Sequence, residues 1–333
     1  MRHATLVKLA RVHRVHLPPA LTGDWPLRLA GAADERGWFR FQRLYDIARS
    51  VLRTEADVRR LLLETAEDEA ADGSGWLEIQ VDPSGYAARF GGLTPTVELV
   101  LDAAAQASRA TGVGIGVIIA ANRTRHPLDA RTLARLAVQY AGGGVVGFGL
   151  SNDERRGAPA EFAPAFRIAR RAGLLSVPHG GELCGPDSVR ACLDELHANR
   201  IGHGIAAAAD PGLARRLAAR SVTLEVCPAS NVALGVFAKP ADVPLPRLLE
   251  AGVPVALGAD DPLLFGSRLT AQYDLARNEF GLGDADLAEL ARMSVRGSVA
   301  PDAVRARLLA GIDRWLGADP ASEADADEHG LGS

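Results

Sequence analysis

The chain has 333 residues, of which 47% are hydrophobic and 23% are charged, and its formal net charge is −4. This interspersed, nearly balanced charge gives no indication of a nucleic-acid partner or a membrane surface. The three cysteines lack CxxC spacing and no apolar run reaches membrane-spanning length, so we expect a protein of the reducing cytoplasm without a disulfide framework.

The first part of the chain is expected to be helical. Apolar residues at helical spacing predict a helix over Thr5–Val15, and a second helix is predicted over Thr54–Ala71, where Thr54 can act as the N-cap. Between them, Gly37–Leu52 holds the densest group of aromatic side chains in a chain with 5% aromatic residues. This segment is either a helix that packs its apolar face on a core or an apolar lid over a pocket.

From position 76 onward, predicted strands and helices alternate. The strands are predicted over Trp76–Val81, Gly114–Ala121, Val145–Leu150, Leu174–His179, Arg200–His203, Val222–Cys227 and Val253–Gly258. The helices are predicted over Thr94–Thr111, Asp129–Tyr140, Pro159–Ala172, Pro186–Ala198, a segment that starts at Asp210, and Leu245–Ala251, with two closing helices near Asp284–Val295 and Pro301–Trp315. Strands rich in Val, Ile and Leu on both faces are typical of a parallel sheet.

The repeated strand–helix unit predicts an α/β fold, namely a TIM-type (β/α)8 barrel that forms one domain over residues 1–316. A helix precedes the first predicted strand, and the strands number seven rather than eight. We therefore expect the first strand of the barrel to be missing from this chain. Residues 317–333 combine Asp and Glu with Ala, Gly and Ser, which predicts a disordered acidic tail.

Polar residues follow four of the predicted strands. They lie in the motifs HGGE (179–182), RIGHG (200–204), CPASN (227–231) and GADDP (258–262). In a (β/α)8 barrel, the carboxyl ends of the strands form one mouth where catalytic residues gather. His179 and Glu182 are separated by two glycines, which allow a tight turn and a close approach of a ligand, so both side chains can point into one space.

These side chains suit metal-assisted hydrolysis. Imidazole and carboxylate groups bind Zn²⁺, and catalytic zinc keeps one position for a water molecule that can lose its proton near neutral pH. Glu182 could supply a proton to the substrate, and His203 could handle the proton of the water. Each motif alone also has a structural interpretation, such as a core histidine, a glycine turn, a helix N-terminus or, for Cys227, a small core residue. A metallohydrolase that acts on an amide or a phosphoester is a further alternative.

Taken together and in this order, HGGE, RIGHG, CPASN and the DD pair of GADDP resemble the adenosine deaminase family of the amidohydrolase superfamily, from about Arg2 to Trp315. The resemblance implies one Zn²⁺ per chain, with His179 and Asp260 as ligands.

It also implies catalytic roles for three side chains. Glu182 would protonate the purine ring nitrogen next to the attacked carbon, and His203 would orient and deprotonate the water. Asp261 would hydrogen-bond the other ring of the purine.

The substrate implied by the resemblance is a 6-aminopurine nucleoside, an adenosine-like small molecule whose exocyclic amine is released as ammonia. Phe39, Phe41 and Tyr45 resemble the lid of the family over the ribose side. Asn152 lies where the family usually has a glycine whose backbone N–H meets the purine. Because of this difference, aminodeoxyfutalosine, an adenosine-like intermediate of menaquinone synthesis, is an alternative substrate.

The family also opens with an HxH motif that supplies two further zinc ligands, and this motif is missing before His3. His13 and His16 have HxxH spacing but are expected on the wrong side of the barrel. Either the start of the protein lies upstream of Met1, or the chain is a catalytically impaired deaminase-like protein. We favour the first explanation because the downstream residues are all present.

Overall fold

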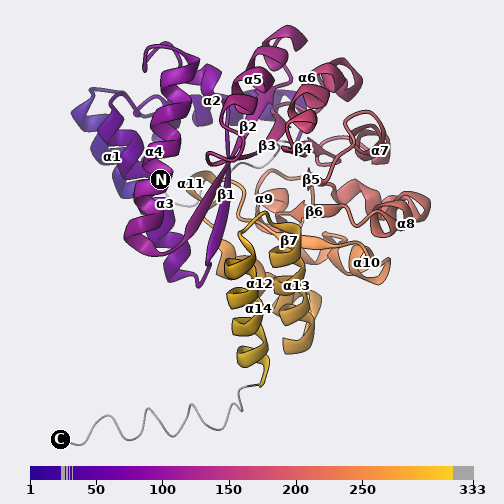
Figure 1. Ribbon diagram of the computed structural model, residues 1–333. Helices are drawn as coiled ribbons and strands as arrows, with labels where there is room; N and C mark the ends of the chain where they lie inside the picture. Colours follow the sequence, from indigo (N-terminus) through magenta and orange to yellow (C-terminus); the bar gives the residue numbers. More distant parts are fainter. Residues whose placement is uncertain (24–26, 28, 30, 32, 318–333) are drawn as a thin grey trace, which may run out of the picture.

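The computed structural model describes residues 1–23, 27, 29, 31 and 33–317. Its centre is a parallel sheet of seven strands in the order β1-β2-β3-β4-β5-β6-β7. The strands are β1 (Trp76–Val81), β2 (Gly114–Asn122), β3 (Val145–Ser151), β4 (Leu175–Gly180), β5 (Arg200–His203), β6 (Thr223–Val226) and β7 (Val255–Leu257). The sheet curls on itself and helices surround it (Figure 1), which confirms a TIM-type (β/α) barrel with seven strands.

The longer helices follow the strands or precede the sheet in the chain. They are α1 (His3–Val12), α2 (Glu35–Arg49), α3 (Glu55–Ala71), α4 (Leu93–Thr111), α5 (Pro127–Gln139), α6 (Pro159–Arg171), α7 (Pro186–Asp194), α8 (Pro211–Ala219), α12 (Leu269–Phe280), α13 (Asp284–Gly297) and α14 (Asp302–Gly317). Shorter helices are α9 (Pro228–Ala233), α10 (Leu245–Glu250) and α11 (Pro262–Phe265), together with the 3-10 turns η1 (Pro19–Leu21), η2 (Pro83–Gly85), η3 (Ile205–Ala209) and η4 (Pro240–Asp242). Among the described helices, none combines the length and apolar character that a membrane span requires.

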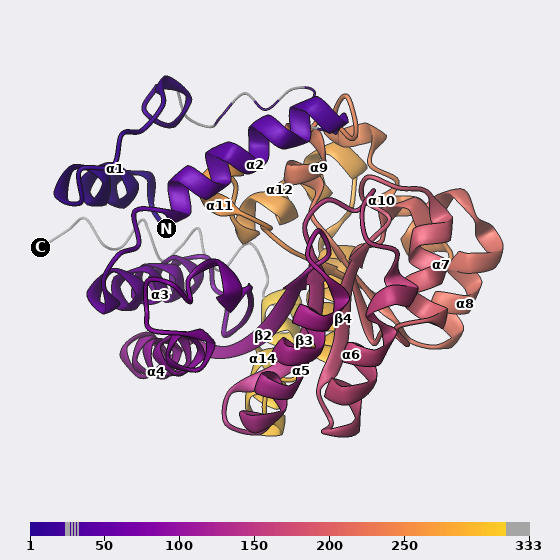
Figure 2. The same cartoon turned by 90° about the horizontal axis from the view of Figure 1, so that it is seen from above.

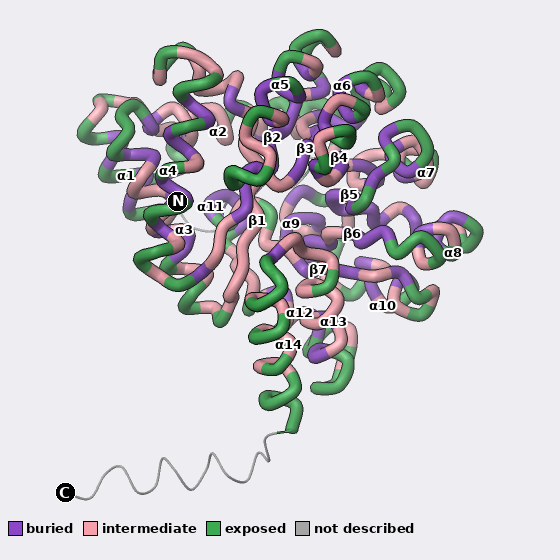
Figure 3. Tube along the Cα trace, in the orientation of Figure 1, coloured by how far each residue is buried: buried purple, intermediate pink, exposed green. Residues whose placement is uncertain are grey.

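Burial follows the layers of the barrel. The strands and the inner faces of the helices are buried or half-buried, and exposed residues lie on the outer faces of the helices (Figure 3). The strand order leaves β1 and β7 at the two edges of the sheet. Every residue of β1 is half-buried, whereas most of β2 is fully buried, because β2 has neighbours on both sides.

Most predicted elements are confirmed, and their ends shift by a few residues. Thr54 caps α3 in a reciprocal capping box with Asp57, and Asp210 caps α8 as expected. Helix α12 was missed because its deeply buried positions are few and one of them is the polar Gln272, so the apolar periodicity is weak. The predicted acidic tail lies outside the described residues, apart from Gly317 at the end of α14.

Helix α2 contains the aromatic segment of the N-terminal part. It crosses the side of the barrel where α9 and α11 lie (Figure 2), and its Phe41 belongs to the same buried apolar cluster as Leu263, Leu264 and Phe265 of α11. The ring of Phe41 stacks on that of Phe265, with centroids 5.8 Å apart. Since α11 begins directly after Asp261, this packing ties α2 to the carboxyl end of β7.

A buried ionic network links distant strands near the amino end of β5. The guanidinium of Arg200 pairs with the carboxylates of Glu78 on β1 and Glu225 on β6, and it donates a hydrogen bond to the backbone oxygen of Gly297. The other oxygen of Glu78 accepts from the backbone N–H of Val299 at 2.9 Å. Burial alone would raise the pKa of Glu78, but Arg200 and these hydrogen bonds outweigh burial and lower it, so the carboxylate is ionised at neutral pH.

We expect Arg200→Met to lower the free energy of unfolding by about 3–5 kcal/mol, because it leaves the Glu78 carboxylate buried without its cation. Urea denaturation followed by circular dichroism measures the change. The matched control is Arg277→Met, which breaks an exposed pair with Asp284 and should cost about 1 kcal/mol or less. Equal losses in the two variants would contradict the structural role of the network.

Candidate active site

Four strand ends gather the polar side chains of the sequence motifs. Strands β4 and β5 pair in parallel with Gly180 opposite His203 and His179 opposite Gly202. Cys227 follows β6 directly, and the acidic pair Asp260–Asp261 follows β7. Because neighbouring parallel strands end at the same edge of a sheet, these groups lie at one rim of the barrel.

Gly202 makes room for the imidazole of His179. A Cβ atom at position 202 would lie 2.4 Å from Cδ2 of His179, which is closer than real Cβ atoms come to other carbons. Without that atom, the rings of His179 and His203 lie edge to face, with centroids 5.1 Å apart and an interplanar angle of 88°. The glycine of the RIGHG motif therefore determines where the histidine of the neighbouring strand lies.

Glu182 and His203 form a buried acid–imidazole pair. Oε2 of Glu182 lies 3.5 Å from Nε2 of His203, and the two side chains are 8% and 5% exposed. Within the described residues, Oε1 of Glu182 and Nδ1 of His203 are buried without a hydrogen-bond partner. Buried polar atoms are rarely left unpaired, and those that are cluster at functional sites, so this pair offers free acceptor and donor positions to a ligand.

The surroundings shift the proton affinities of these groups in different directions. Burial, with the charges of Asp260 and Glu154, raises the pKa of Glu182 to about 7. Burial would lower the pKa of His203, but the neighbouring carboxylates outweigh it and raise that pKa. Burial lowers the pKa of His179 well below its ordinary value, and the charge of His203 adds to this effect, so the ring is neutral at pH 7. A neutral imidazole is the form that binds a metal.

Three side chains are spaced to hold a metal ion. The ligand atoms of His203, Cys227 and Asp260 all lie within 4.8 Å of one another. Nitrogen, sulfur and carboxylate oxygen are the donors that zinc prefers, so the residues present fit such an ion. Cys227, which we expected to be a small core residue, is buried and belongs to this group. His179, a predicted ligand, is not one of the three, but its ring lies against that of His203.

Backbone strain accompanies this arrangement. His203 and Asp260 have φ angles of 62° and 57°, in the left-handed region that side-chain-bearing residues seldom adopt. Such conformations persist where the surrounding structure holds them, and they cluster at ligand sites.

Tyr45 packs against the apolar cluster that contains Leu263, Leu264 and Phe265, directly after Asp261. Burial and the charge of Asp260 raise the pKa of Asp261 to about 6. Burial also raises the pKa of Tyr45, with contributions from Tyr86 and Asp261. The packing of α2 on α11 therefore brings Tyr45 to the side of the site where β7 ends.

The other aromatic residues of α2 lie differently. Phe41 packs between Trp38 and Phe265 in the core, with centroid distances of 5.2 and 5.8 Å. Phe39 is 65% exposed. Of the three predicted lid residues, Tyr45 is therefore the one that the structure brings to Asp261.

Asn152 lies after β3 with a φ angle of 81°. Its Oδ1 accepts from the backbone N–H of Asp153 at 2.7 Å, and its Nδ2 donates to Oε1 of Gln42 on α2 at 3.3 Å. Asparagine tolerates the left-handed conformation better than most residues, so it can replace a glycine here. Its side chain ties the β3 loop to α2.

Sequence analysis missed two residues behind the site. Glu154 receives hydrogen bonds from the loop that carries Glu182, and Arg123 donates to the backbone oxygen of His179 at 2.6 Å. Both side chains are buried and follow strand ends, at β3 and β2. Arg123 comes directly after β2, so a charged residue at a strand end was the available signal for it, whereas Glu154 lies three residues beyond β3.

His13, one of the two histidines of the HxxH pair, lies elsewhere. Its Nε2 is 2.9 Å from Oδ2 of Asp57 at the start of α3.

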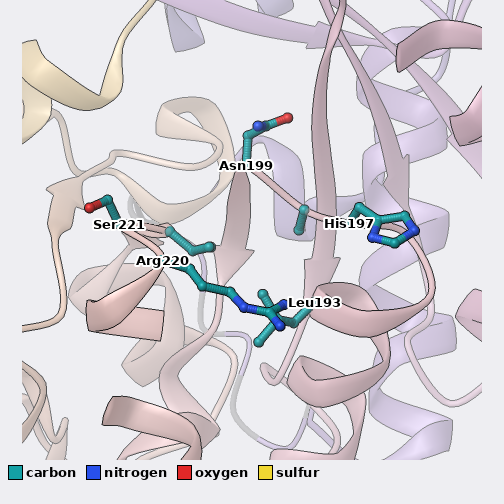
Figure 4. Close-up of a pocket in the computed structure, with 7 residues that line it drawn as sticks. Leu193, His197, Asn199, Arg220 and Ser221 are labelled. Atoms are coloured by element: carbon teal, nitrogen blue, oxygen red, sulfur yellow. The ribbon is translucent and has the colours of Figure 1, made fainter. Parts of the chain in front are cut away.

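A separate pocket of about 260 Å³ lies at the other end of the strands. Its lining includes His197, Asn199, Arg220 and Ser221, in the loops that precede β5 and β6 (Figure 4). These loops are at the amino ends of the strands, so this pocket is distinct from the rim that holds His203 and Asp260.

Comparison with known proteins agrees with the arrangement of these groups. The adenosine deaminase family model matches residues 1–315. A putative adenosine/adenine deaminase of Streptomyces virginiae is 66% identical over 316 residues, which cover 95% of this chain and 93% of that protein. An adenine deaminase of Rhizobium leguminosarum is 37% identical over 271 residues, which cover 81% and 84% of the two chains.

The fold is also similar to that of a deaminase of known structure. The crystal structure of an adenine deaminase from Arthrobacter aurescens superimposes with a TM-score of 0.85 at 30% identity, and the match covers 95% of each chain. The chain therefore belongs to the adenosine deaminase family, and it is a hydrolase that acts on the carbon–nitrogen bond of a purine.

Proposed function

We propose that this chain hydrolyses the 6-amino group of adenine, with adenosine as the second candidate substrate. The relatives at 37–38% identity and the solved structure at 30% identity are named adenine deaminases. The relatives at 66% identity are named for both the nucleoside and the base, which supports adenosine, the nucleoside that we expect from the motifs, as the other candidate. The observation that carries the proposal is the buried pair of Glu182 and His203, 3.5 Å apart, beside three potential metal ligands.

We propose zinc as the metal of this site. His179 and Asp260 would hold it, and Cys227 and His203 lie close enough to complete or border the ligand set. A bound divalent cation makes a water molecule a stronger acid near neutral pH. Asp260 also offers a carboxylate oxygen at the rim, a donor that suits such a cation.

Glu182 serves as the proton donor in this proposal. Burial raises its pKa to about 7, so a large fraction of the side chain carries a proton at neutral pH. Oε2 faces His203, which leaves the unpartnered Oε1 to hold the proton against a ring nitrogen of the purine. Protonation of that nitrogen withdraws electrons from the adjacent C6 and prepares it for attack by water.

His203 accepts the proton of the water. Its raised pKa, caused by the neighbouring carboxylates against the effect of burial, makes the ring a stronger base than an ordinary histidine. The same proton can then pass to the departing amine, which leaves as ammonia, while the remaining hydroxyl proton returns to Glu182 as the 6-oxo group forms. Asp261 and the backbone N–H near Asn152 are proposed to bind the purine, and Tyr45 of α2 is proposed to border its N9 side.

The substrate proposal is tested by an ammonia-release assay on the full-length protein with adenine, adenosine, deoxyadenosine and aminodeoxyfutalosine. We expect kcat/KM to be highest for adenine. The same assay distinguishes the alternatives. A higher kcat/KM for adenosine than for adenine would make the protein a nucleoside deaminase. Turnover of aminodeoxyfutalosine alone would support the menaquinone alternative.

Glu182→Gln should lower kcat on the best substrate by about 10²-fold or more, because the amide has the same shape but cannot donate an acidic proton. Glu195→Gln is the matched control, since this exposed residue lies after α7 in the same strand–helix unit. Circular dichroism checks that both variants are folded. Turnover that survives in Glu182→Gln would favour a metallohydrolase of a different class.

Gly202→Ala should weaken the binding of a divalent metal by roughly 10-fold or more, because the added methyl group displaces the imidazole of His179. Competition with a chromophoric zinc chelator measures the affinity. Gly317→Ala adds the same methyl group in open space at the exposed end of α14 and should leave the affinity unchanged. Equal affinities in the two variants would remove His179 from the proposed ligand set.

A further inference from the structure

The carboxylate of Glu154 gathers the whole loop that carries Glu182. Its Oε1 accepts from the backbone N–H of Gly181 and from the hydroxyl of Ser188. Its Oε2 accepts from three more backbone N–H groups, at 2.9 Å from Glu182, 2.6 Å from Leu183 and 3.1 Å from Cys184. Four consecutive backbone N–H groups and one hydroxyl therefore converge on a single buried carboxylate.

Among the described residues, the N–H groups of this loop have no partner in a helix or strand, although the backbone oxygen of Gly181 accepts from the N–H of Ala206 at 3.0 Å. Residues 181–184 lie between β4 and α7 and belong to neither element. Backbone N–H groups in such a position need an acceptor, and successive N–H groups that point to one side form a concave site for an anion. Glu154 supplies that anion from within the chain, through charge-assisted hydrogen bonds that are stronger than neutral ones.

Arg123 also holds the backbone near this loop, through hydrogen bonds to His179 and Glu154. Its Nη2 donates to the backbone oxygen of His179 at 2.6 Å, and its Nη1 donates to the backbone oxygen of Glu154 at 3.3 Å. The side chain is 2% exposed, although a guanidinium is costly to bury. Arg123 thus links the ends of β2 and β4 to the residue that holds the loop.

The side chain of Glu182 has little to fix it apart from its own backbone. Its Oε1 has no partner among the described residues, and its Oε2 contacts His203 at 3.5 Å, which is long for a hydrogen bond. Gly181, just before it, has a φ angle of 75°, so the chain turns sharply at this point. The direction in which Glu182 points therefore depends on the backbone that Glu154 anchors.

We propose that Glu154 is a positioning residue, which holds the loop 181–184 so that the carboxyl group of Glu182 meets the purine ring nitrogen. This inference rests on the proposed function, because it presumes that Glu182 is the proton donor. Glu154 itself does not touch the substrate, since both of its oxygens are taken by the loop and Ser188. A displacement of a catalytic group by about 1 Å can cost 10²-fold in rate, and Glu154 prevents such a displacement.

The test replaces Glu154 by Gln and by Asp in the full-length protein. Glu154→Gln keeps the shape, but its amide turns N–H groups toward the N–H donors of the loop. We expect kcat on the best substrate to fall by about 10²-fold while KM changes by about threefold or less. Glu154→Asp keeps the charge but shortens the reach, so we expect partial rescue, with kcat between those of Glu154→Gln and the parent protein.

The matched control is Glu64→Gln. Glu64 of α3 is also a buried carboxylate with several donors, including Thr5 of α1 and Arg60, and none of its described hydrogen bonds comes from the loop 181–184. We expect its loss to lower the melting temperature and leave kcat unchanged at a temperature where the variant is folded. If Glu64→Gln lowered kcat as much as Glu154→Gln at equal loss of stability, the role of Glu154 would be structural and the inference would be wrong.

Hydrogen exchange supplies a measurement that does not depend on turnover. In Glu154→Gln, we expect the amide protons of residues 181–184 to lose protection while those of β4 keep it. Unchanged protection at 181–184, or an unchanged kcat in Glu154→Gln, would overturn the inference and leave the proposed function intact. A parent protein without purine deaminase activity would instead overturn the proposed function, and the exchange data alone would then decide whether Glu154 holds the loop.

Discussion

The site depends on one constraint, the parallel register of β4 and β5. This pairing brings Gly180 opposite His203 and Gly202 opposite His179, so two histidines from distant parts of the chain share one rim. The register alone would leave a clash, because a side chain at position 202 would overlap the ring of His179. Glycine at this position removes the clash, and the remaining groups of the rim, from β6 and β7, follow from the same parallel order.

Burial and neighbouring charges then shift the pKa values of the side chains at this rim. Glu182 and His203 are close and buried. Burial raises the pKa of Glu182 to about 7, and the neighbouring carboxylates raise the pKa of His203 against the effect of burial. Burial lowers the pKa of His179, so its ring is neutral. One fold thus supplies an acid, a base and a neutral ligand from two residue types, and the difference lies in what surrounds each side chain.

The fold and most of the rim could be predicted from the sequence. Strands buried on both faces appear as short apolar runs, and the polar motifs follow these runs directly. The seven strands, the capping residues Thr54 and Asp210 and the four motif positions are examples. The contribution of Cys227 and the roles of Glu154 and Arg123 could not be predicted in this way. They depend on contacts between residues far apart in the chain, such as Glu154 with Glu182, and no local pattern encodes those contacts. Phe39 shows that an aromatic residue in an apolar segment can still be exposed to solvent, which the sequence pattern did not reveal.

The left-handed backbone at Asn152, His203 and Asp260 has a consequence for attempts to make this enzyme more heat-resistant. Glycine would relieve the local torsional cost at each of these positions by roughly 1 kcal/mol or more. A stability screen without an activity filter would therefore be drawn to the residues whose side chains matter most for turnover. The backbone strain at these three positions is retained because their side chains serve the site. Variants designed for heat resistance should therefore keep these residues.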